Sequence, residues 1–276
     1  GRGVQFGLRE FFRNQADVKE AGLEGTLEGK SIIIQGLGNV GYHAAKFLEE
    51  EDGARIIAVI ERDGAIINEA GLPIEKVSAY KQEYGKVEGF PDSEFEANGA
   101  KILTHPCDIL IPAAMEGVIT DENAEELQCK VVAEAANGPV TYEADQILNK
   151  RNIFIIPDAY LNAGGVTVSY FEWLKNLSHV KFGRMDRRFA EAQSQKIIEL
   201  MEGALGKKLD KQAKEQLLEG PNEINLVRSG LDDTMRESYN EIYEQQKSNP
   251  KIEDRRTAAY ALAIKKIADI YDSMYL

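Results

Sequence analysis

The sequence predicts an α/β fold, in which a doubly wound, mostly parallel sheet is followed by a C-terminal helical segment. Short apolar runs alternate with helical patterns through about residue 157, which is typical of a parallel sheet with crossover helices. The first run contains Ile32, Ile33 and Ile34 in succession, as a strand buried on both faces requires. From Val166 onward the patterns are helical only.

The composition excludes several classes of protein. The chain has 276 residues, 33 basic and 46 acidic, and its net charge of −13 argues against a nucleic-acid or anionic-membrane surface. No apolar run approaches the roughly 20 residues of a membrane span. Cys107 and Cys129 suit a reducing compartment, so we expect a cytoplasmic protein, and the three scattered histidines predict no metal site.

The first half of the predicted sheet can be taken in chain order. A core-packed helix over residues 4–21 precedes the first strand. The next helix runs from Asn39 to about Glu51 and is followed by a strand over 56–60. A hairpin-like segment around 65–67 and a helix over about 75–84 come next.

The second half continues the alternation. Residues 85–99 are rich in Gly, Pro, Asp and Glu and are predicted to be a loop. Three further buried strands are predicted over 108–111, 131–134 and 153–156. Beyond them we expect a packed helix containing Trp173 in the core, followed by amphipathic helices over 183–220, 226–248 and 255–275.

These elements suggest two parts. The first covers 1–226, with its core sheet at about 30–160 and a helical region at about 165–226, and the glycines at 36, 38 and 41 after its first strand predict a dinucleotide-binding domain. The second part comprises the C-terminal helices over 227–276.

The stretch after the first strand carries the strongest motif. Gly36, Gly38 and Gly41 form G-x-G-x-x-G, in which the glycines permit a tight turn, close approach of a pyrophosphate and close helix packing. The free N–H groups at the helix start attract phosphate. A second strand ends at Glu61, about 20 residues further on, where an acid binds the ribose 2′-hydroxyl. An ordinary strand–helix turn is the alternative for the glycines alone.

Other strand ends converge on the same crevice. Ligands of doubly wound sheets bind outside the carboxyl ends of the strands. Those ends carry Ala113 and Ala114, whose small side chains let a ligand lie on the backbone, and Asn137 and Asn162, each with a donor and an acceptor. The two asparagines suit a nicotinamide carboxamide or ribose, and turn asparagines are the alternative for each.

Several segments together resemble the glutamate dehydrogenases. They are GRGV at 1–4, QGLGNVG at 35–41, PCDILIPAA at 106–114, EAANGP at 134–139, NAGGVTVSYFEWLKN at 162–176, SGLDDTM at 229–235 and RTAAYALAI at 256–264. The resemblance covers essentially the whole chain, and the 162–176 run is unlike the leucine, valine or phenylalanine enzymes of the superfamily.

The resemblance implies roles for individual residues. Leu37, Gly38, Asn39 and Val40 would hold the pyrophosphate, Glu61 the adenosine ribose, Ala113 and Ala114 the adenine side, and Asn137 and Asn162 the nicotinamide half. Ser169 matches the serine that hydrogen-bonds the substrate γ-carboxylate, and Val166 matches a residue that lines that pocket. Back-bonding of Ser169 to its own helix is the alternative.

The implied activity is reversible oxidative deamination of L-glutamate to 2-oxoglutarate and ammonia, in a homo-oligomer that the resemblance makes a hexamer. Glu61 disfavours a 2′-phosphate, whereas the neighbouring Arg62 can pair with one, so NAD is predicted and NADP is left open. Family enzymes carry the catalytic lysine and aspartate in a preceding domain, so we assign no catalytic residue and expect this chain to supply the cofactor-binding half. The alternatives are a dehydrogenase of another amino acid and a stand-alone dinucleotide-binding or regulatory module.

Overall fold

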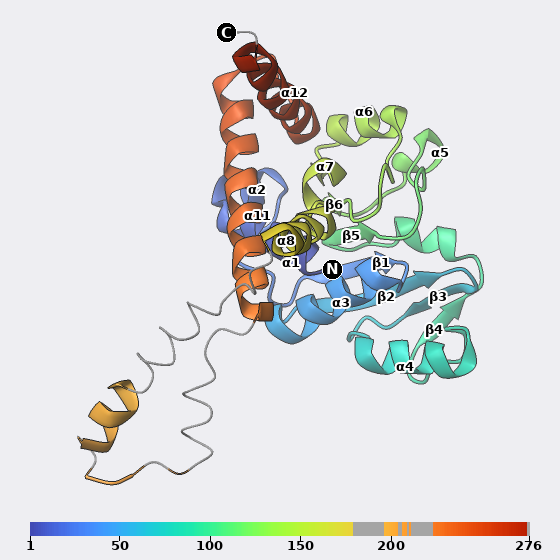
Figure 1. Cartoon of the computed structure of the whole chain (residues 1–276). Coiled ribbons are helices and arrows are strands. Elements are labelled where there is room, and N and C mark those ends of the chain that lie inside the picture. Colours follow the sequence, from blue (N-terminus) through green and yellow to red (C-terminus); the bar gives the residue numbers. More distant parts are fainter. Residues whose placement is uncertain (179–195, 204–205, 209, 211–222, 275–276) are drawn as a thin grey trace. The chain divides into compact units, whose positions relative to one another are not determined.

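The structure is a computed structural model that describes residues 1–178, 196–203, 206–208, 210 and 223–274 (Figure 1). These residues form two compact units. The first comprises Gly1–Gly164 together with Met235–Leu276, and the second comprises Gly165–Thr234. Each unit is described by itself below.

A seven-stranded sheet in the order β4-β3-β2-β1-β5-β6-β7 organises the first unit. Strands β2, β1, β5, β6 and β7 are parallel, and β3 and β4 extend the edge as antiparallel strands. This is the doubly wound, mostly parallel, Rossmann-like sheet that the sequence predicts. The strands are β1 (Ser31–Gln35), β2 (Arg55–Glu61), β3 (Gly64–Ile67), β4 (Glu94–Glu96), β5 (Ile109–Pro112), β6 (Val131–Ala133) and β7 (Phe154–Ile156).

The order of the strands places a topological switch point between β1 and β5. The chain leaves β1 toward β2 on one side and later returns to β5 on the other side. The carboxyl ends of these two strands therefore form the crevice in which sheets of this type bind their ligands.

Helices cover both faces of this sheet. The helix α3 contacts β1 and β2, α1 packs on α3, and α12 contacts β7 and α7. The helical elements of the unit are α1 (Arg2–Arg13), α2 (Gln15–Glu20), α3 (Asn39–Asp52), α4 (Ile74–Tyr84), the 3₁₀ helix η1 (Gly99–Thr104), α5 (Asp121–Ala124), α6 (Tyr142–Lys150), α7 (Asp158–Leu161), the C-terminal part of α11 (Glu223–Ser248) and α12 (Arg255–Met274).

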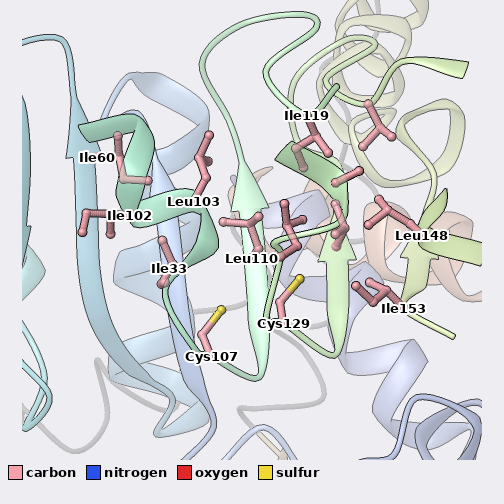
Figure 2. Close-up of a cluster of buried hydrophobic side chains, with 14 of the residues drawn as sticks. Ile33, Ile60, Ile102, Leu103, Cys107, Leu110, Ile119, Cys129, Leu148 and Ile153 are labelled. Atoms are coloured by element: carbon pink, nitrogen blue, oxygen red, sulfur yellow. The ribbon is translucent and has the colours of Figure 1, made fainter. Parts of the chain in front are cut away.

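One apolar core lies between the sheet and η1, α5 and α6 (Figure 2). Ile33 and Leu110 enter it from neighbouring strands, and Leu148 enters it from α6. Cys107 and Cys129 lie within the same core, and burial raises the pKa of the Cys129 thiol to about 12. Both cysteines therefore act as small apolar side chains rather than as nucleophiles.

A buried polar network joins the N-terminal and C-terminal helices of this unit. The Tyr239 hydroxyl on α11 donates to Asp17 on α2, and Arg255 on α12 pairs with the same carboxylate. Burial raises the pKa of the Tyr239 phenol, so it remains a donor. The network joins α11 and α12 to α2.

The structure corrects two predicted elements. The predicted helix over residues 4–21 is two helices, because the Asn14 side chain accepts from the N–H groups of Ala16 and Asp17 and caps a new helix. The predicted loop over 85–99 contains β4, which pairs with β3 although its own side chains are largely exposed. Edge strands of three residues give little periodic signal.

The helix α8 (Gly164–Ser178) leads into the second unit, and it differs from the prediction of a packed core helix. Trp173 is 54% exposed and Val166 is 74% exposed, so the prediction that Trp173 lies in the core is wrong. Helical spacing groups these side chains on one face but does not supply an element that covers it. Residues 196–203 are helical, whereas most of the predicted helix over 183–220 lies outside the described residues.

Candidate dinucleotide-binding site

The glycine turn between β1 and α3 has a distinct physical requirement at each position. Gly36 has a φ of +91°, and a Cβ there would lie 2.7 Å from the Cβ of Ala114. A Cβ at Gly41 would lie 1.8 Å from the Gly36 carbonyl oxygen. A Cβ at Gly38 would meet nothing within 4 Å. Gly41 therefore permits the close approach of α3 to the end of β1, Gly36 permits the close approach of Ala114, and Gly38 faces open space.

The start of α3 offers unused donors to that space. Gly38 is the N-cap, and no side chain caps the helix or places an acid in its first turn. The 14-residue helix therefore presents the free N–H groups of Asn39 and Val40 and the positive end of its dipole, whereas the N–H of the preceding Leu37 is donated to Glu61. This arrangement fits a pyrophosphate, as the predicted motif requires.

The Glu61 carboxylate lies at the end of β2, directly beside the turn. Its Oε1 accepts from the backbone N–H of Leu37 at 2.5 Å and from the Lys81 ammonium at 2.6 Å. Both side chains are partly buried, with Glu61 13% and Lys81 30% exposed. The structure thus brings Glu61 and the glycine turn together, as predicted from spacing alone.

Lys81 was missed by the sequence analysis. It belongs to α4, and its contact with Glu61 depends on how that helix packs on the sheet, for which the sequence carries no local signal. Arg62, which was considered as the basic partner of a 2′-phosphate, is exposed in the turn after β2. The structure therefore provides two basic residues near the acid.

Ala113 and Ala114 follow β5 and lie against the glycine turn. The Ala113 N–H donates to the Gln35 carbonyl at 2.9 Å, and Ala114 is the residue that a Cβ at Gly36 would strike. Their small side chains permit this close approach to Gly36 and Gly41.

Asn137 and Asn162 also meet. Nδ2 of Asn162 donates to Oδ1 of Asn137 at 2.6 Å and to the carbonyl of Ala136 at 3.2 Å. These bonds do not use Nδ2 of Asn137 or Oδ1 of Asn162, which are one donor group and one acceptor. A carboxamide, which carries one of each, is complementary to that pair.

Ser169 and Val166 belong to the second unit and are described separately. The Ser169 hydroxyl donates to the Gly165 carbonyl at 3.0 Å, which is the back-bonding alternative considered above. Both side chains are exposed. A substrate carboxylate could accept a hydrogen bond from the Ser169 hydroxyl only if the bond to the Gly165 carbonyl were broken.

A buried ion network borders the asparagine end of the site. Glu134, at the end of β6, is completely buried and pairs with Arg256 of α12 at 2.8 Å. Burial raises the pKa of the Glu134 carboxyl, and the hydrogen bond from Arg256 opposes that rise. This pair has no local sequence signal, because Glu134 and Arg256 are far apart in the chain.

The fold and the glycine turn define a dinucleotide-binding domain of the dehydrogenase class. The family model described as glutamate/leucine/phenylalanine/valine dehydrogenase matches residues 2–228. The chain therefore belongs to the glutamate/leucine/phenylalanine/valine dehydrogenase family of oxidoreductases, which use a nicotinamide cofactor.

Two relatives are similar along nearly the whole chain. A probable glutamate dehydrogenase of Sinorhizobium fredii is 47% identical over 272 residues, which are 98% of this chain and 61% of that protein. The mitochondrial glutamate dehydrogenase of Dictyostelium discoideum is 48% identical over 273 residues, which are 99% of this chain and 54% of that protein. The chain thus spans a little over half the length of these relatives.

Solved structures agree on the fold. A hetero-hexameric glutamate dehydrogenase from Thermus thermophilus matches with a TM-score of 0.69 at 21% identity, covering 98% of this chain and 53% of that one. The Peptoniphilus asaccharolyticus enzyme matches with a TM-score of 0.63 at 25% identity, covering 100% of this chain and 54% of that one. Among the described residues, no helix is long and apolar enough to cross a membrane.

Proposed function

We propose that this chain is the cofactor-binding portion of an enzyme that interconverts L-glutamate with 2-oxoglutarate and ammonia. The observation that carries the proposal is the contact between Glu61 and the glycine turn at the switch point. It places a carboxylate that can accept from a ribose hydroxyl beside a turn that can bind a pyrophosphate. A bound nicotinamide would accept or donate the hydride. The chain's own residues bind and orient that cofactor.

The cofactor is proposed to lie along the crevice, with its adenosine ribose toward one end and its nicotinamide toward the other. Asn39 and Val40 offer backbone N–H groups to the pyrophosphate, and Leu37 lies beside it with its own N–H donated to Glu61. The Glu61 carboxylate accepts from the adenosine ribose. At the other end, Asn137 and Asn162 hold the nicotinamide half.

The proposed cofactor is NAD, with NADP bound more weakly. The Glu61 carboxylate accepts from a 2′-hydroxyl and repels a 2′-phosphate. Lys81 and Arg62 reduce that repulsion, because an ammonium 2.6 Å from the carboxylate offsets its charge. A strict exclusion of NADP is therefore not expected.

L-Glutamate is proposed as the substrate because of the similarity to named glutamate dehydrogenases and because Ser169 supplies a hydroxyl for a side-chain carboxylate. A leucine or phenylalanine side chain offers that hydroxyl no acceptor, so the hydroxyl would stay bonded to the Gly165 carbonyl and add nothing to substrate binding. The proposed domains are 1–226 and 227–276. We propose a homo-oligomer, which the family resemblance makes a hexamer; the Thermus assembly is also a hexamer, but a hetero-hexameric one. A cytoplasmic location remains a prediction, as one relative is mitochondrial.

The substrate assignment is tested in the intact enzyme by comparing L-glutamate, L-leucine, L-valine and L-phenylalanine in NAD reduction. The proposal requires a higher kcat/KM for L-glutamate than for the other three. Preference for an apolar amino acid would instead place the chain among the other dehydrogenases of its family.

A further inference from the structure

Arg256, near the start of α12, is the centre of a partly buried network of three carboxylates, of which Glu134 is completely buried. Its Nε donates to Asp145 Oδ1 at 2.8 Å, and its Nη2 donates to Glu134 Oε1 at 2.8 Å. Its Nη1 lies 3.6 Å from Asp158 Oδ1. One planar guanidinium thus joins α12 to the end of β6, to α6 and to the start of α7.

Two of these carboxylates, those of Glu134 and Asp158, also accept hydrogen bonds from backbone N–H groups. The second oxygen of Glu134 accepts from the Asp158 N–H at 2.8 Å, which fixes the start of α7. The second oxygen of Asp158 accepts from the Gly138 N–H at 2.8 Å. Gly138 has a φ of +52° and holds the turn after β6.

Both segments carry the asparagines of the candidate site. Asn137 immediately precedes Gly138, and Asn162 immediately follows α7. Their amides bond each other at 2.6 Å. A displacement of either segment would break that bond and disturb the donor–acceptor pair.

We propose that Arg256 is a positioning residue which, through Glu134 and Asp158, holds Asn137 and Asn162 in the arrangement that binds the nicotinamide half of the cofactor. This inference rests on the proposed function. It assigns to α12 an influence on one end of the site only, because the glycine turn and Glu61 lie outside the network.

A neighbouring arginine provides a matched control. Arg255 is adjacent on α12 and also forms a buried ion pair, but its partner is Asp17 on α2. Removing either guanidinium leaves a buried carboxylate without its partner and lowers stability. Only Arg256 is linked to the asparagines, so a purely structural role would give both variants the same binding behaviour.

The experiment compares R256K and R255K in the 276-residue chain, with NADH and with ADP-ribose, which lacks the nicotinamide. Lysine keeps the charge but loses the forked contacts. We expect R256K to raise the Kd for NADH about tenfold, as loss of one well-placed polar contact does, and to leave the Kd for ADP-ribose within about twofold. R255K should change neither.

Equal weakening of both ligands in R256K, an unchanged NADH affinity, or the same split in R255K would overturn the inference while leaving the proposed function intact. Failure of the wild-type chain to bind either ligand would overturn the proposed function, and this inference with it.

A second variant, D158A, tests the same inference in case R256K does not fold. D158A removes the last link of the network and retains Arg256, and it should show the same split between NADH and ADP-ribose. Hydrogen exchange of the Gly138 amide should quicken in D158A and in R256K but not in R255K. Unchanged exchange in folded R256K would contradict the proposed route.

Discussion

The glycine turn gives the sharpest prediction, because Gly38 and Gly41 differ in what a methyl group would meet. A Cβ at Gly41 would lie 1.8 Å from a backbone oxygen, whereas carbon–oxygen contacts are normally at least about 3.3 Å apart. The Gly41→Ala variant must therefore separate α3 from β1. We expect a cost of about 1–3 kcal/mol, typical of overpacking, and a Tm lower by about 3–10 °C.

Gly38→Ala should behave in the opposite way. A Cβ at Gly38 meets nothing within 4 Å, and the residue has an extended backbone with φ of −80° and ψ of −167°. Alanine fits there, at the cost of about 1 kcal/mol or less for a poorer N-cap. The methyl group would nevertheless occupy the space proposed for the pyrophosphate, so NADH affinity should fall at least about tenfold.

The assay combines thermal unfolding with titration of NADH for both variants and the wild type. The expected result is a stable Gly38→Ala chain that binds poorly and a destabilised Gly41→Ala chain. Gly38→Ala that binds NADH as tightly as the wild type would refute the role given to the turn. A Gly41→Ala chain as stable as the wild type would refute the packing argument.

Three further predictions concern single side chains. Lys81→Ala should weaken NADPH binding about three- to tenfold more than NADH binding, because it removes a partly buried positive charge near the 2′-position. An unchanged ratio in parallel titrations would contradict this role. Ser169→Ala in the intact enzyme should raise KM for L-glutamate while cofactor affinity stays the same; unchanged glutamate kinetics would remove Ser169 from the substrate pocket. Because the pKa of Cys129 is raised to about 12, only about one thiol in 10⁴ is ionised at pH 8, so a thiol reagent should react only as the protein unfolds. Rapid reaction of the folded chain between pH 7 and 9 would disprove that burial.

The features that could be predicted from the sequence are those with a local signal. The β-branched run Ile32–Ile34 and the three glycines specify a strand, a turn and a helix within a few residues. The meeting of Asn137 with Asn162 was also predictable, because both follow parallel strands whose carboxyl ends lie at one edge.

The features that could not be predicted depend on how distant segments pack. Lys81 contacts Glu61 only because α4 packs beside β2, and Arg256 contacts Glu134 only because α12 returns to the sheet. For Trp173 the prediction was wrong although a local pattern was present. Apolar spacing along α8 predicted a buried face, yet the side chain is exposed, since periodicity does not specify what covers a helix.

The proposed function requires that the crevice at the ends of β1 and β5 binds a nicotinamide dinucleotide. We would therefore first titrate the 276-residue chain with NADH and with NADPH, followed by fluorescence or calorimetry. We expect saturable binding of NADH and weaker binding of NADPH. Absence of saturable binding by either cofactor would contradict the proposed site.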